Sequence, residues 1–91
     1  MIDKIKNFIF EETLNTYDNK AFSSEDLKSF IEEQEAEIEL ALNCYYRYED
    51  ENEDSNYEIT QRAWSMYDTV RQYNQPVINA LKTILKERGD L

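Results

Sequence analysis

The chain has 91 residues, 41% of them hydrophobic, with twelve aromatic side chains and a net charge of −10. The hydrophobic content argues against a disordered chain, and the size scaling predicts one modest core and a folded surface of roughly 5,600 Å². One Gly and one Pro are too few for the turns of a β protein. We therefore expect one all-α domain over residues 1–91, a small helical bundle of three to four helices with a long acidic second helix.

The N-terminal segment predicts a first helix over about Ile2 to Tyr17. Apolar residues recur at helical spacing on more than one side of this segment. A helix that is apolar on several sides is usually buried on several sides, so we expect it deep in the bundle. The segment carries acids and no long apolar run, so we expect neither a signal peptide nor a membrane span. We therefore expect a cytoplasmic protein.

A second helix is expected over about Glu25 to Tyr48. Ser23 and Asp26 have the spacing of a capping box, with Asp in place of the preferred Glu or Gln. The apolar residues of this helix fall within one arc of about 120°. The members of that arc, with one Gln among them, are Leu27, Phe30, Ile31, Gln34, Ile38, Ala41, Leu42 and Tyr45.

The charge run from Glu49 to Asn56 is expected to form a loop, because like charges in sequence repel. A third helix starts near Tyr57, and its apolar side is formed by Ile59, Ala63, Trp64, Met66, Tyr67 and Val70. Pro76 either kinks this helix or begins a fourth, and we favour a short fourth helix from Pro76 to Arg88, since Pro suits a first turn. Gly89 is placed to end it.

Catalytic and cofactor motifs are missing from the sequence. The chain has no His and a single Cys, Cys44, so a Cys–His pair and an internal disulfide are both excluded. We expect Cys44 to be a half-buried structural residue. The sequence also lacks zinc, haem and nucleotide motifs, and it predicts a protein that is not an enzyme and needs no cofactor.

One segment has partial calcium-loop spacing. Asp50, Asn52 and Asp54 match positions 1, 3 and 5 of an EF-hand loop. Ser55 then stands where the sharp turn requires Gly, and Gln61 stands where a bidentate Glu is required. We therefore expect no metal site, and these three residues are the calcium candidates that the sequence offers.

The negative charge is concentrated in the middle of the chain. Residues 25–58 contain thirteen acids and two bases, a net charge of −11, whereas the remaining residues contain seven acids and eight bases. Two acidic rows flank the apolar arc of the second helix: a first row of Glu25, Glu32 and Glu39, and a second row of Asp26, Glu33 and Glu37. A chain of this charge repels nucleic acid, so direct binding to DNA or RNA is disfavoured.

Tyr residues are interleaved with these acids. Adjacent helix positions differ by 100°, so the rings of the Tyr45-Tyr46-Arg47-Tyr48 stretch cannot all reach one core. Tyr is enriched at binding hot spots. The predicted partner-binding residues are Glu25, Glu32, Glu35, Glu39, Tyr46, Tyr48, Glu49, Asp50, Glu51, Glu53 and Asp54.

Acid rows beside exposed aromatics suit docking on a basic protein surface, such as that of a nucleic-acid-binding protein. In composition and layout the chain resembles the small acidic DNA-mimic proteins of phages and mobile elements, although no motif is shared. That resemblance implies an inhibitor of restriction enzymes, CRISPR effectors or other DNA-binding proteins, acting in the host cytoplasm.

Two other functions stay open: a helical immunity or antitoxin-like protein that neutralises a basic toxin, and an accessory or assembly subunit.

The apolar arcs of the first and third helices exceed the needs of a thin bundle, and Leu40 lies between the acidic rows. A homodimer and a surface for another partner are both open explanations.

Overall fold

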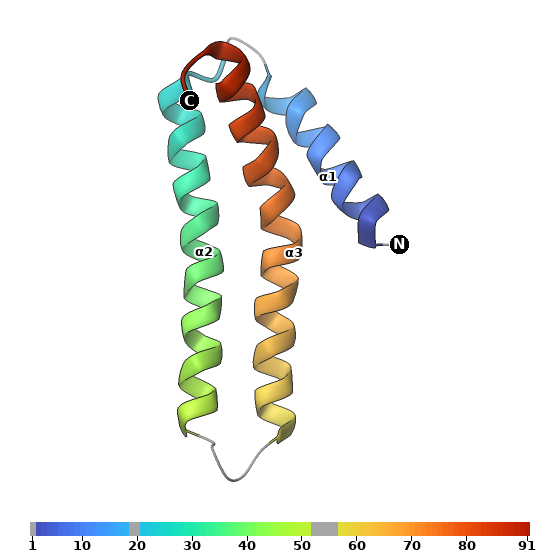
Figure 1. Ribbon diagram of the computed structural model, residues 1–91, viewed down its shortest axis with the longest axis vertical. Coiled ribbons are helices and arrows are strands. Elements are labelled where there is room, and N and C mark those ends of the chain that lie inside the picture. The colour runs from blue at the N-terminus through green and yellow to red at the C-terminus, as the bar shows by residue number, and fades with distance from the viewer. Residues whose placement is uncertain (1, 19–20, 52–56) are drawn as a thin grey trace.

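A computed structural model describes residues 2–18, 21–51 and 57–91. The described residues form three helices, α1 (Ile2–Tyr17), α2 (Ser24–Glu51) and α3 (Tyr57–Arg88), and contain no strand (Figure 1). The molecule is elongated, with principal extents of 52 × 28 × 17 Å. The predicted all-α bundle is confirmed.

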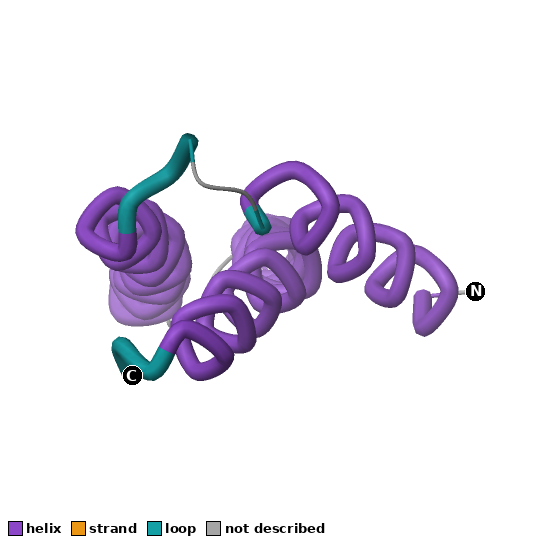
Figure 2. Tube along the Cα trace, turned by 90° about the horizontal axis from the view of Figure 1, so that it is seen from above, coloured by secondary structure: helices purple, strands orange, loops and turns teal. Residues whose placement is uncertain are grey.

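The two long helices α2 and α3 lie antiparallel, side by side, and α1 packs on another side of α3 (Figures 1 and 2). Direct contacts between α1 and α2 are few. The expectation that α1 lies deep in the bundle is therefore wrong: α3 is the central helix, and Phe8 of α1 is 65% exposed. With α3 as its main neighbour, α1 buries one side and leaves its second apolar side uncovered.

The core lies where the C-terminal half of α3 meets the N-terminal half of α2. Its buried members are Leu27, Ile31, Ile78, Leu81, Ile84 and Leu85. Rings of Tyr17, Phe22 and Phe30 close this end, with centroid separations of 4.9 to 6.1 Å. Every residue of the predicted α2 arc is buried or partly buried, which confirms the helical periodicity.

Both predicted caps are present. The backbone N–H of Asp26 donates to Ser23 Oγ at 3.1 Å, and the N–H of Ser23 donates to Asp26 Oδ2 at 3.4 Å, so the capping box forms with Asp. At the other end, Gly89 has φ 79°, and the N–H groups of Gly89 and Asp90 donate to the carbonyls of Lys86 and Leu85. This is a Schellman motif, and it ends α3.

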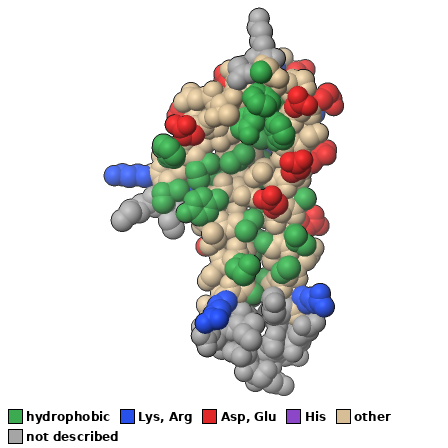
Figure 3. Space-filling view, turned by 180° about the vertical axis from the view of Figure 1, so that it is seen from behind, with side chains coloured by type: hydrophobic (Ala, Val, Ile, Leu, Met, Phe, Trp, Pro, Cys, Tyr) green, Lys and Arg blue, Asp and Glu red, His purple; other side chains and the backbone are tan. Residues whose placement is uncertain are grey.

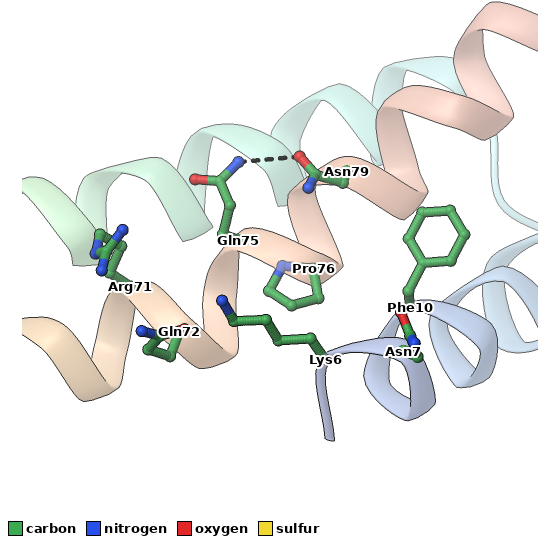
Figure 4. A pocket seen from close by; sticks show the side chains of 8 residues that line it. All are labelled: Lys6, Asn7, Phe10, Arg71, Gln72, Gln75, Pro76 and Asn79. Carbon is green, nitrogen blue, oxygen red and sulfur yellow. Dashed lines mark hydrogen bonds between the residues drawn. The ribbon is translucent and has the colours of Figure 1, made fainter. Parts of the chain in front are cut away.

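The favoured fourth helix from Pro76 to Arg88 is wrong, because α3 is one helix that continues through this residue. The other alternative, one long helix that contains Pro76, is the one observed. Pro76 is buried, and it lies near Phe10 of α1 in the hollow between α1 and α3 (Figure 4). Packing against α1 offsets part of the cost of the hydrogen bond that the proline nitrogen cannot donate. Tertiary contacts thus override a local helix breaker.

The lower end of the hairpin also differs from the expectation. Glu49, Asp50 and Glu51 belong to α2 by their backbone, so the predicted loop start at Glu49 is wrong. Glu is a good helix former, and this propensity outweighs the repulsion within the short charge run. Residues 52–56 of the predicted loop lie outside the described residues.

Candidate interaction surface

The predicted partner-binding residues with described side chains are exposed and lie on α2. They are Glu25, Glu32, Glu35, Glu39 and Tyr46. The backbone of Tyr48, Glu49, Asp50 and Glu51 continues α2, but their side chains, and the whole of Glu53 and Asp54, lie outside the described part of the chain. The structure therefore brings five of the eleven predicted residues onto one element.

These five residues share one side of α2. The first acidic row, Glu25, Glu32 and Glu39, has a spacing of seven residues, and Tyr46 is the next residue at that spacing. Each step advances about 10.5 Å along the helix and drifts about 20° around it. Glu35 lies four residues before Glu39 and therefore beside the row. The row is a gently winding line of carboxylates that ends in an aromatic ring.

Tyr46 is also the first ring of a chain of four aromatics that crosses from α2 to α3. The centroids of Tyr46 and Tyr45 are 5.7 Å apart, those of Tyr45 and Trp64 5.3 Å, and those of Trp64 and Tyr67 5.4 Å. We call these four residues the aromatic ladder. Tyr46 is 52% exposed and Trp64 is 44% exposed, so the ladder presents two large rings to solvent beside the acidic row.

Trp64 is the functional candidate that the sequence reading missed, since it was assigned to the apolar side of the third helix. It lies next to the buried Ala63, and adjacent positions differ by 100°. The 100° step that turns Tyr46 outward from Tyr45 likewise turns Trp64 outward from Ala63. Trp, Tyr and Arg are the side chains most enriched at interface hot spots.

The acids of α2 outnumber its two bases, Lys28 and Arg47. Lys28 lies 3.9 Å from Glu25, and both side chains are well exposed. An exposed pair of this length contributes little stability. Glu37 of the second acidic row accepts a hydrogen bond of 2.7 Å from Asn74 Nδ2 of α3. In the first acidic row, Glu25 is the member engaged in the exposed, weak pair with Lys28.

An apolar groove lies on the other side of the seam between α2 and α3. Its volume is about 430 Å³, and its lining residues are Glu37, Leu40, Ala41, Cys44, Ala63, Met66 and Val70. Cys44 is exposed here, so the expectation of a half-buried residue is wrong. Cys44 and Tyr46 differ by about 200° around α2, as do Met66 and Trp64 around α3, so the groove and the aromatic ladder face opposite ways.

A smaller polar hollow of about 220 Å³ lies between α1 and α3 (Figure 4). Lys6 reaches into it from α1, and Gln75 donates a hydrogen bond of 3.0 Å to Asn79 at its upper edge. Its lining contains no carboxylate, thiol or imidazole. The two basic side chains of the lining are Lys6 and Arg71.

Within the described residues, no group of three or more His, Cys, Asp or Glu side chains is arranged to hold a metal ion. The calcium candidates do not change this, because Asn52, Asp54 and the side chain of Asp50 lie outside the described residues. In the same described ranges, no helix combines the length and the apolar character that a membrane crossing needs.

Comparison with protein-family models, with curated proteins and with solved structures finds no match to this chain.

Proposed function

We propose that this protein is a non-enzymatic docking protein that binds a basic, nucleic-acid-binding surface of a partner protein. The observation that carries the proposal is the heptad line of Glu25, Glu32 and Glu39 that continues into Tyr46. The carboxylates supply long-range attraction and orientation, and the exposed rings of Tyr46 and Trp64 supply the apolar contact that holds the complex. The proposed role is that of a phage or mobile-element inhibitor of host defence, with the acidic row in place of DNA phosphates.

The row spacing supports recognition of a basic channel. Three carboxylates at intervals of about 10.5 Å cover about 21 Å of α2. Basic side chains that follow a DNA backbone form an extended strip of similar length, so a rigid helix engages several of them at once. Rigid presentation lowers the entropy cost of binding compared with a flexible acidic tail.

The test measures how much the chain inhibits DNA binding by a panel of purified restriction enzymes and RNA-guided nucleases, in gel-shift assays at low and high salt. We expect at least one enzyme to be displaced from DNA, and the inhibition to weaken steeply as salt rises. The triple variant Glu32→Lys, Glu35→Lys and Glu39→Lys should abolish the inhibition without unfolding the chain, since all three side chains are exposed.

A matched control separates the row from overall charge. Reversal of Glu11, Glu12 and Glu87 to Lys changes the net charge by the same amount, at exposed positions on α1 and α3. This control should inhibit nearly as well as the unaltered chain. Equal losses in the two triple variants, or a true partner whose binding surface is neutral or acidic, would contradict the proposal.

The aromatic ladder has its own test. The double variant Tyr46→Ala and Trp64→Ala should weaken binding about 30-fold or more, as expected for two hot-spot rings. The salt dependence should stay unchanged, because no charge is removed.

A further inference from the structure

An apolar and aromatic stripe runs along α3 at spacings that alternate between three and four residues. This is the spacing of a helix seam whose side chains interdigitate with those of a neighbouring helix. We call it the α3 stripe, and its members are Ala63, Met66, Val70, Tyr73, Val77, Ala80 and Ile84. Side chains at this spacing pack well against helices along the whole stripe.

Only the C-terminal half of the α3 stripe is covered. Ala80 and Ile84 are fully buried, and Leu14 of α1 packs against the core cluster that contains Ile84. In the N-terminal half, Met66 is 69% exposed and Tyr73 is 49% exposed. Figure 1 shows the reason, because α1 diverges from α3 toward its own N-terminus. The uncovered half covers residues 63–77, about 21 Å or four helical turns.

Apolar side chains of two other helices flank the uncovered half. On one side, Leu40 and Cys44 of α2 line the apolar groove, and Leu40 is 66% exposed. On the other side, Ile5 of α1 is 42% exposed and lines a hollow of about 210 Å³ together with Tyr73. In Figure 3, hydrophobic side chains follow the seam between α2 and α3 and continue toward α1. A contiguous apolar face of this shape marks a contact with another molecule, and its seam spacing fits a helix.

The charge beside the groove determines which kind of helix fits. α2 contains ten acids and two bases, a net charge of −8. Glu37 lines the groove, and Glu33 lies one turn before it on the same side of α2. Both side chains are exposed, and Figure 3 shows acidic side chains along this edge beside the hydrophobic ones. A helix with Lys or Arg next to its apolar side therefore meets opposite charges along α2.

The bases at the far end of the groove do not reverse this preference. Arg47 and Arg62 lie there, and each already has a partner within the chain. A second copy of the chain is a poor occupant, because its net charge is also −10. A two-fold pair through this groove would place two α2 helices, each of charge −8, side by side.

We propose that the uncovered half of the α3 stripe binds a basic amphipathic helix of a partner protein. The apolar residues of that helix pack between Leu40, Met66 and Tyr73, and its Lys or Arg residues lie beside Glu33 and Glu37. The inference does not depend on the proposed docking function. The groove shares no residue with the first acidic row or with the aromatic ladder, so the two surfaces can be tested separately.

The probe is a synthetic peptide of roughly 18 residues with Leu at heptad positions a and d and Lys at the flanking positions. Fluorescence anisotropy of the labelled peptide measures its binding to the full chain. We expect a scrambled peptide of the same composition to bind about 30-fold more weakly, because it keeps the charge and loses the apolar side. A peptide with Glu in place of each Lys keeps the apolar side and should also bind about 30-fold more weakly.

Variants of the stripe place the bound peptide on α3. Met66→Gln and Tyr73→Gln should each weaken binding of the Leu/Lys peptide about tenfold, as expected for exposed apolar side chains that become buried on binding. Both should keep the helical circular dichroism of the unaltered chain, because Gln is a good helix former. Leu91→Gln is the matched control, since Leu91 is equally exposed and lies outside the stripe, and it should leave binding unchanged.

A matched pair of double variants tests the side of α2 that the peptide contacts. Glu33→Gln with Glu37→Gln should weaken binding about tenfold. Glu32→Gln with Glu39→Gln removes the same charge from the same helix, in the first acidic row, and should weaken binding by about twofold at most. Equal losses in the two double variants would show that the peptide follows overall charge, and would overturn the proposal.

The single thiol gives a local readout. Cys44 is exposed and lines the groove, so a saturating amount of the Leu/Lys peptide should slow its reaction with a thiol reagent, and the scrambled peptide should not. A Leu/Lys peptide that does not bind at about 1 mM, the weakest range of specific complexes, overturns the proposal. So does equal binding of the scrambled or the Glu peptide. A chain that sediments as a dimer, and that Met66→Gln returns to a monomer, would assign the groove to a second copy instead.

Discussion

Nη1 of Arg88, the last residue of α3, donates a hydrogen bond of 2.9 Å to the backbone carbonyl of Phe22, which lies between α1 and α2. Ser24 Oγ donates to the carboxylate of Asp90 at the same end of the molecule. These two contacts join residues 66 positions apart. They tie the C-terminus to the start of α2, so the closed end of the bundle is held by polar contacts as well as by its apolar core.

We expect Arg88→Ala to lower the free energy of unfolding by about 2 kcal/mol, because a charged donor is lost from a partly buried carbonyl. The measurement is urea unfolding followed by circular dichroism, at one protein concentration. Lys82→Ala, an exposed change on the same helix, should stay within about 0.5 kcal/mol of the unaltered chain. Equal effects of the two changes would show that the Arg88 bond is not stabilising.

The capping box of α2 gives a second expectation. Ser23→Ala removes the oxygen that accepts the Asp26 N–H and should cost about 1 kcal/mol of stability. Ser23→Asp keeps an acceptor at this position and should stay close to the unaltered chain. Ser29→Ala, an exposed change in the interior of α2, should be neutral or slightly stabilising, since Ala has the higher helix propensity. A Ser23→Ala variant as stable as Ser29→Ala would rule out the cap as a stabilising feature.

Much of the fold follows from periodicity and local chemistry. The apolar arc of α2 predicted the burial of Leu27 and Ile31. Ser23 and Gly89 marked helix ends through short-range hydrogen bonds that depend on neighbouring residues alone. Features of this kind are encoded within about one helical turn, so one sequence is enough to read them.

The arrangement of the helices could not be read in the same way. The two apolar sides of α1 indicated burial, but periodicity does not say whether a neighbouring helix covers each side, and Phe8 remains exposed. The first acidic row was predicted because its spacing lies within one helix. The aromatic ladder could not be predicted, because the contact between Tyr45 and Trp64 depends on the register between α2 and α3.

Pro76 provides a third expectation, because α3 continues through it. A proline inside a helix costs about 3 kcal/mol or more, and its buried ring returns part of this by packing against α1. We expect Pro76→Ala to raise the free energy of unfolding by about 1 kcal/mol. Gln75→Ala, an exposed neighbour, is the control and should change little. A less stable Pro76→Ala variant would mean that the ring contributes more by packing than the helix loses.

The ion pair between Arg71 and Asp68 of α3 predicts a pH effect. Arg71 Nη2 lies 2.8 Å from Asp68 Oδ1. The hydrogen bond from the Arg71 guanidinium holds the pKa of Asp68 below its ordinary value, against the opposing effect of desolvation. A carboxylate with a lowered pKa stabilises the fold above its unfolded pKa of about 3.9, and this contribution is lost as pH falls through the lower folded value.

The expected outcome is therefore a small loss of stability in Asp68→Asn at pH 7 that is smaller at pH 3. Arg71→Ala should show the same loss at pH 7, and the double variant should be little worse than either single change, because one interaction is removed in all three. Urea unfolding midpoints at the two pH values give the measurement. The effect is small because the pair is exposed and screened by solvent. If the loss of stability in Asp68→Asn grows toward acid pH instead of shrinking, the pH dependence is opposite to the predicted one. Arg71 then does not stabilise the carboxylate of Asp68 in the folded chain.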